Sequence, residues 1–200
     1  MEVIEIVQRI NRVRASPQRQ GFSDTRSHQE LTAQRLMLEH RLNTLVQNIQ
    51  PNEESTITPL RRLRLLSTAD LYRLAASLYL LRVLPLHDDD TIRPSILSSA
   101  LATLDRLDMA TSPWPLFIIA CEAVEDDARV QVLRVLERME VLRGIGNVRV
   151  MRGIVEAFWK QVDLRADAAG SPGQSHRSSQ AHTLGWAELV NCDHPVPWFI

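Results

Sequence analysis

Apolar residues recur every three or four positions along most of this chain, as they do on one face of an α-helix. The first run places Ile6, Ile10 and Val13 on one face, and the later runs are rich in leucine. The pattern predicts helices within residues 1–14, 27–50, 58–84, 93–107, 112–125, 126–143, 147–165 and 184–190. We therefore expect an all-α fold, an irregular bundle of about seven to nine helices.

Residues that favour helix ends mark several of these boundaries. Ser27-His28-Gln29-Glu30 matches a capping box, in which the serine and glutamate side chains each accept a backbone N–H. Thr58-Pro59 fits an N-cap followed by a first-turn proline. Asn147 is expected to cap the last long helix. Helix ends are expected at Pro51, Pro85 and Gly144, with polar loops over 15–27 and 51–58.

The stretch from Ser112 to Asp127 is the most apolar part of the chain. Ser112 is a plausible N-cap, and the run from Leu116 to Cys121 contains no charged or hydrogen-bonding side chain other than the thiol. This predicts a helix submerged in a core. Glu122 then needs a partner, because an unpaired buried carboxylate costs several kcal/mol. We expect that partner to be a group on a neighbouring helix, such as Arg152 or the indole of Trp159.

The size and composition indicate one helical domain over 1–200, because 200 residues with 44% hydrophobic content can form one sizeable core. Within it, 1–66 are N-terminal helices and 67–165 are the core helices. Residues 166–182 are rich in glycine and serine and predict a flexible linker. Residues 183–200 predict a short helix and an apolar tail that docks onto the bundle, since exposed Trp198 and Phe199 would form a sticky patch.

The charge balance gives no general reason to bind nucleic acid or an anionic membrane. Lys plus Arg number 23, and Asp plus Glu number 24. Arg61, Arg62 and Arg64 alternate with leucine, and we interpret them as the solvated face of a helix. No apolar run approaches the roughly 18 residues that span a bilayer, and Glu2 and Glu5 stand where a secretory signal would be cationic. We expect a soluble protein of a reducing compartment.

Motifs for catalysis or metal binding are weak. The acidic run His87-Asp88-Asp89-Asp90 lacks carboxylates one helical turn apart, so we interpret it as a solvated loop and not as a metal site. Cys121 is expected to be a core residue, and Cys192 and His194 supply only two of the four donors of a structural zinc site. The Gly-Ile-Gly-Asn turn before residue 148 leads into a mostly apolar helix, which disfavours a DNA-reading helix-turn-helix.

Three segments together resemble a known family. They read LYRLAASLYL at 71–80, WPLFIIACEA at 114–123 and NVRVMRGIVEAFWKQVD at 147–163. Their order and spacing are similar to the C-terminal part of the fungal-specific transcription factor domain that follows Zn2Cys6 binuclear zinc clusters. The resemblance runs from about residue 67 to the C-terminus. The residues that carry it are Tyr79, Trp114, Pro115, Phe117, Cys121, Glu122, Asn147, Trp159 and Trp186.

This resemblance implies the regulatory region of a nuclear transcription factor, without catalytic activity. It implies contacts with other proteins of the transcription machinery, with a related regulator or with a small-molecule effector. Zinc is expected only in the cluster, which needs six cysteines where this sequence has two, so no cofactor and no specific DNA binding are expected here. Two alternatives stay open: a stand-alone helical interaction module, and an all-helical enzyme that acts on a hydrophobic substrate through Asp88 to Asp90.

Overall fold

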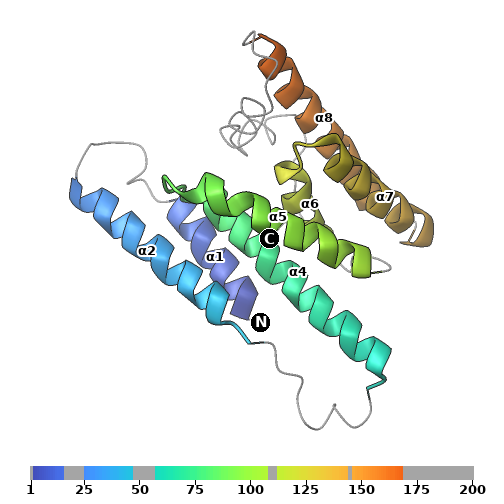
Figure 1. Ribbon diagram of the computed structural model, residues 1–200, viewed down its shortest axis with the longest axis horizontal. Coiled ribbons are helices and arrows are strands. Elements are labelled where there is room, and N and C mark those ends of the chain that lie inside the picture. Colours follow the sequence, from blue (N-terminus) through green and yellow to red (C-terminus); the bar gives the residue numbers. More distant parts are fainter. Residues whose placement is uncertain (1, 16–24, 47–56, 108–111, 144–145, 169–200) are drawn as a thin grey trace. The chain divides into compact units, whose positions relative to one another are not determined.

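Seven helices make up nearly all of the protein that the computed structural model describes, which is residues 2–15, 25–46, 57–107, 112–143 and 146–168 (Figure 1). These residues contain no strand, so the all-α prediction is confirmed for them. The chain divides into two compact units, residues 1–107 and 108–200, and each is described by itself. The helices are α1 (Glu2–Ala15), α2 (Thr25–Thr44), α4 (Pro59–Val83), α5 (Asp89–Arg106), α6 (Pro113–Glu122), α7 (Asp126–Arg143) and α8 (Gly146–Ala168).

The first unit is built around α4, which contacts α1, α2 and α5 (Figure 1). From Leu71 to Val83 most residues of α4 are buried. α1 contributes Ile6 and Ile10, and α2 contributes Leu38 and Leu42. All four side chains are at most 1% exposed. Burial of such an aliphatic side chain stabilises a fold by about 1.5–3 kcal/mol, so these contacts hold the unit together.

The start of α4 has the predicted cap and is exposed to solvent. The hydroxyl of Thr58 accepts a hydrogen bond from the backbone N–H of Arg61 at 3.3 Å, and Pro59 occupies the first turn. The helix then continues through 67–70 without a break. Residues 59–66 are all exposed, and they include the three arginines at 61, 62 and 64. The interpretation of those arginines as a solvated face is confirmed.

The second unit packs α6 against both α7 and α8, and α7 against α8. Every residue of α6 from Pro115 to Glu122 is buried, which confirms the prediction of a submerged helix. α8 presents a buried stripe at helical spacing, made of Val148, Met151, Val155, Phe158 and Val162. Because both α7 and α8 contact α6, a ten-residue helix with almost no polar surface is stable here.

Several predicted helix ends are wrong, because the backbone continues past the local signal. α2 begins at Thr25 and ends at Thr44, so Ser27 lies inside it and is not an N-cap. α5 begins at Asp89 and has Pro94 inside it. α8 begins at Gly146, so Asn147 is already helical, and it runs to Ala168, three residues into the predicted linker. The predicted helix at 184–190, the docked tail and the Gly144 cap lie outside the described residues.

Candidate functional site

Trp159 connects the two helices that carry the most distinctive sequence segments. Its indole Nε1 donates a hydrogen bond to the carbonyl oxygen of Ala120 at 2.9 Å. Ala120 lies in the last turn of α6, and its carbonyl oxygen also accepts the backbone N–H of Ala123, the C-cap residue, at 3.2 Å. The side chain of α8 therefore adds a second hydrogen bond to a carbonyl group at the end of α6. The Trp159 side chain is only 6% exposed, so water does not compete freely for this carbonyl.

Arg129 of α7 completes this arrangement from the third helix. Its guanidinium lies over the Trp159 ring, 5.4 Å from the ring centroid, which is a cation–π distance. Nη1 and Nη2 donate to the two carboxylate oxygens of Asp163 at 2.8 and 3.0 Å. Nε donates to the carbonyl oxygen of Ala123, the C-cap of α6, at 3.3 Å. Ala120, Ala123, Arg129, Trp159 and Asp163 are called the α6 clamp below.

The contacts of the α6 clamp hold helices together. Its guanidinium donates three hydrogen bonds, two to Asp163 and one to Ala123, and its indole N–H is bonded to a carbonyl oxygen. The arrangement fixes the end of α6 relative to α7 and α8. Arg129 and Asp163 were missed as functional residues by sequence reasoning, although a cation and an acid near the ends of two predicted helices are the signal that points to them.

Glu122 is buried as predicted, but the indole of Trp159 is not its partner, because that N–H is donated to Ala120. Arg152, the other expected partner, lies beside Glu156 at 2.8 Å and Glu140 at 3.6 Å. The hydrogen bond that Nε of Arg152 donates to Glu156 is the main cause that raises the pKa of Arg152 above its usual value. Arg152 is therefore held at the α7–α8 surface by carboxylates on its own and the neighbouring helix.

The other signature residues fall at several places. Phe117 and Cys121 are core residues of α6, at 4% and 1% exposure, as expected for Cys121. Pro115 is buried and Trp114 is half-buried, whereas Asn147 is exposed. Tyr79 belongs to the first unit, where its hydroxyl donates to Oδ1 of Asn11 of α1 at 2.6 Å. The structure thus gathers the α6 and α8 residues and places Tyr79 in a separate contact. Trp186 lies outside the described residues.

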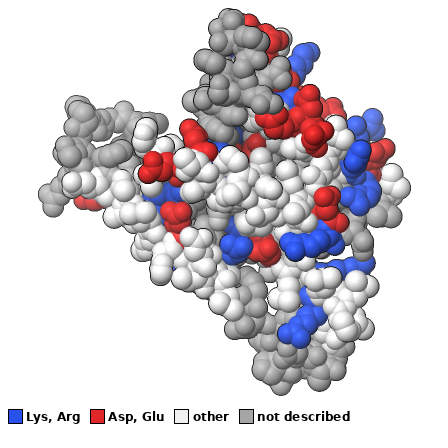
Figure 2. Space-filling model, in the orientation of Figure 1, with Lys and Arg blue, Asp and Glu red and all other residues white. Residues whose placement is uncertain are grey.

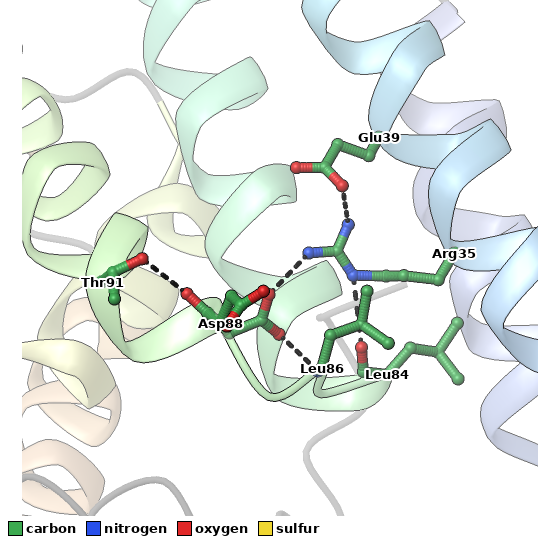
Figure 3. Close-up of polar contacts among 7 residues, drawn as sticks. Arg35, Glu39, Leu84, Leu86, Asp88 and Thr91 are labelled. Carbon is green, nitrogen blue, oxygen red and sulfur yellow. Dashed lines mark hydrogen bonds and ion pairs between the residues drawn. The ribbon is translucent and has the colours of Figure 1, made fainter.

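A second polar centre lies in the first unit, where Arg35 of α2 reaches the turn between α4 and α5 (Figure 3). Nη2 of Arg35 donates to Oδ1 of Asp89 at 3.1 Å, Nη1 to Oε2 of Glu39 at 2.8 Å and Nε to the carbonyl oxygen of Leu84 at 3.2 Å. The other oxygen of Asp89 accepts the backbone N–H of Leu86 at 2.8 Å. The side chains of Arg35 and Asp89 are 2% and 6% exposed. A charged pair this deeply buried needs all of these bonds.

This centre corrects the interpretation of the acidic run as a solvated loop. Asp89 and Asp90 form the first turn of α5, and Asp89 is buried against Arg35. The physical reason is the guanidinium, which compensates the carboxylate and lets the helix start before Arg93. Sequence reasoning missed Arg35. The available signal was a cation at helical spacing between Leu31, Leu38 and Leu42 on an otherwise apolar face.

The described residues do not fit a metal centre or a binuclear zinc cluster. Within them no group of three or more His, Cys, Asp and Glu side chains is placed to hold a metal ion. Cys121 is enclosed by aliphatic and aromatic neighbours of α6, and Cys192 lies outside the described part. None of the helices in the described ranges is long and apolar enough to cross a bilayer.

Basic and acidic side chains lie close to one another over much of the face drawn in Figure 2. This intermixing agrees with the near-equal numbers of cationic and anionic residues in the sequence. The phosphates of DNA attract a protein mainly through a local excess of Lys and Arg. The face drawn shows no broad area of basic charge on which to base such binding.

Comparison with known proteins adds the family. Searches of curated proteins and of solved structures each gave no significant match. A family model, described as the fungal-specific transcription factor domain, matches residues 2–199. The match therefore includes the N-terminal helices, which the sequence alone relates to this family only as generic helix. Since the model covers nearly the whole chain, the protein belongs to the fungal-specific transcription factor domain family.

Proposed function

We propose that this chain is the region of a fungal-type transcription factor that controls activation, and that it acts through conformation and contact and not through chemistry. The family match over residues 2–199 carries this proposal. The α6 clamp supports it, because a helix end held by two neighbouring helices can move only if all three rearrange. Such an element passes a change at one surface to another. The family match supports a site of action in the nucleus.

We also propose that these 200 residues do not read DNA themselves. The sequence contains two cysteines, and Cys121 is buried in α6. A Zn2Cys6 reader needs six thiolates around two metal ions, so DNA reading has to come from another polypeptide segment or another protein. Sequence-specific duplex binding by the purified chain at physiological salt would overturn this part. The expected result is weak binding that falls steeply with salt and is the same for all duplexes.

A tethering experiment tests the regulatory role. The chain is fused to a heterologous DNA-binding domain and its effect on a reporter gene is measured in yeast. We expect the tethered chain to change transcription and the untethered chain to leave it unchanged. Trp159→Ala should remove the effect because it opens the α6 clamp, while Lys160→Gln, an exposed neighbour on α8, should retain it. An unchanged reporter with a folded, nuclear fusion protein contradicts the proposal.

A second candidate is a stand-alone interaction module, and the start of α4 favours it. Leu60, Leu63 and Leu65 are 59%, 54% and 45% exposed in the first two turns. Exposed leucines in one place are typical of surfaces that bind other proteins. Size-exclusion chromatography separates the candidates. A module that pairs with itself should elute at a mass above that of the monomer, and its Leu63→Glu variant should elute as a monomer. A monomeric original protein that binds no hydrophobic dye would speak against this candidate.

The enzyme alternative loses the residues on which it depends. It requires Asp88 to Asp90 to act together in a cavity, but Asp89 is bonded to Arg35 and to the Leu86 N–H. Asp88 and Asp90 are exposed and do not share an enclosed space with it. We propose that the chain is not an enzyme. Replacement of Asp88 and Asp90 by asparagine should leave the tethered reporter output unchanged.

A further inference from the structure

A groove runs between α1 and α2, and both of its walls belong to the first unit. Its volume is about 580 Å³. Small-molecule sites typically occupy about 300–1,000 Å³, so the groove has the size of a ligand site. It is partly open to solvent, and its lining side chains come from these two helices. The α6 clamp and the Arg35 centre take no part in it.

Cationic side chains dominate the rim of this groove. Arg9 and Arg12 extend from α1 and Arg41 from α2, against the single carboxylate of Glu5. Arg41 is 3.4 Å from Glu2, a long contact between exposed groups. Among the described residues no ion pair neutralises Arg9 or Arg12, and both are exposed. Because they are three positions apart on one helix, their like charges repel, and a bound anion relieves that repulsion.

The floor and one edge of the groove are apolar. Leu38 forms the floor and is 1% exposed, whereas Leu31 and Val13 are half-buried. Met37 is 41% exposed at the edge. An apolar ligand body placed on Val13, Leu31 and Met37 removes their exposed surface from water, which is favourable. The unbranched, polarisable methionine adapts to bodies of different shape.

We propose that this groove binds a small amphipathic organic anion, with its carboxylate or phosphate head between Arg9 and Arg12 and its apolar body over Leu31 and Met37. Guanidinium groups match both head groups through paired N–H donors. The inference deepens the proposed function, on which it rests, since such an anion is the chemical class of effector that the regulatory region recognises. The two helices that line the groove, α1 and α2, both pack on α4.

Isothermal titration of the full chain tests the site with defined probes. Decanoate and decyl phosphate should each bind at one site per chain. Acetate, which lacks the apolar body, and decanol, which lacks the charge, should each bind at least tenfold more weakly. Equal binding of decanol and decanoate, or no binding of either anionic probe, overturns the proposal.

Matched variants locate the binding. Arg9→Gln combined with Arg12→Gln should weaken decanoate binding at least tenfold and leave the circular dichroism unchanged, because both side chains are exposed. Arg61→Gln combined with Arg62→Gln removes the same charge from the exposed start of α4 and should leave decanoate binding within twofold. Equal losses in both double variants would mean general electrostatic attraction and would contradict a site in the groove.

A vesicle arm distinguishes a free anion from a membrane surface. Sedimentation with phosphatidylglycerol vesicles should carry down no more protein than phosphatidylcholine vesicles do, because Arg9 and Arg12 lie beside the carboxylate of Glu5 and each contributes only about 1 kcal/mol at an anionic surface. Vesicle binding that the Arg9 and Arg12 variants abolish would identify a lipid surface and overturn the free-ligand proposal. The titration tests the binding site and the tethered reporter tests the regulatory function. If neither anionic probe binds, the groove proposal fails but a positive reporter result still supports the proposed function. If decanoate binds but the tethered chain does not change transcription, the binding site holds and the proposed function fails.

Discussion

The indole N–H of Trp159 lies 2.9 Å from the carbonyl oxygen of Ala120, and this bond joins the middle of α8 to the last turn of α6. Arg129 of α7 donates to Ala123 three residues later. Side chains from two other helices thus satisfy carbonyl groups at the end of α6, a role that glycine caps and water fill in most helices. The backbone N–H of Ala123 caps α6 by bonding to Ile119 and Ala120, and these two side chains add tertiary contacts to that cap.

Trp159→Phe tests this bond. Phenylalanine keeps an aromatic ring beneath Arg129 but has no N–H, so the free energy of unfolding should fall by about 1–3 kcal/mol. Urea unfolding followed by circular dichroism measures the change. Lys160→Gln, at the exposed neighbouring position, should stay within about 0.5 kcal/mol of the original protein. Equal stability of the Phe variant and the original would show that the bond to Ala120 contributes nothing net.

Arg35 and Asp89 form a buried pair whose members should be coupled. Arg35→Met leaves the Asp89 carboxylate buried without its guanidinium, and we expect a loss of about 3–5 kcal/mol. Adding Asp89→Leu to that variant removes the stranded charge and should restore part of the loss, with a coupling energy above about 1 kcal/mol. A strictly additive double variant contradicts the coupling.

A partly exposed pair on α4 serves as the control for this cycle. Arg73 and Asp70 are 2.6 Å apart on successive turns, but their side chains are 28% and 39% exposed. Solvent screens such pairs, so Arg73→Gln should cost at most about 1 kcal/mol. Arg73 is closer to its aspartate than Arg35 is to Asp89, yet its substitution is expected to lower the free energy of unfolding by less. The comparison therefore tests whether burial or distance decides the strength of an ion pair.

The periodicity of apolar residues predicts the long helices well, and burial explains why. α4, α6 and α8 each place several leucine, isoleucine or valine side chains on the packed face, so the pattern is dense. Helix ends are predicted less well because their determinants are distant in sequence. Asp89 begins α5 with the help of Arg35, which is 54 residues away. A capping box at Ser27 is a local signal, and α2 begins before it.

Some residues of the candidate site could be predicted from the sequence, and others could not. Trp159, Phe117 and Cys121 stand out in the sequence because aromatic and apolar residues gather there. Arg129 does not stand out, because a surface arginine and one that bridges three helices look alike without tertiary contacts. Glu122 is correctly predicted as buried, yet the expected bond from the indole of Trp159 is wrong. The acceptor of the Trp159 N–H is the backbone carbonyl group of Ala120, which no side chain in the sequence reveals.

Cys121 should be protected from thiol reagents in the folded protein. In a Cys192→Ser variant Cys121 is the single cysteine of the chain, and its side chain is 1% exposed in α6. Labelling by a water-soluble disulfide reagent should therefore be slow in buffer and should accelerate in urea together with the loss of helical signal. Fast labelling in buffer, with the helical signal intact, would show that α6 opens locally and that Cys121 is a reactive site.

Gly153→Ala tests whether the outer face of α8 is free of packing constraints. Gly153 lies inside α8 and is exposed, and a Cβ added there meets nothing within 4 Å. Glycine in a helix is less favourable than alanine by about 0.5–1 kcal/mol, so this variant should be more stable by that amount in urea unfolding. Ala157→Gly, one turn later on the exposed face, should be less stable by a similar amount and is the matched control. If Gly153→Ala lowers the stability while Ala157→Gly behaves as expected, a neighbouring chain or segment contacts α8 at Gly153, and that face is an interface.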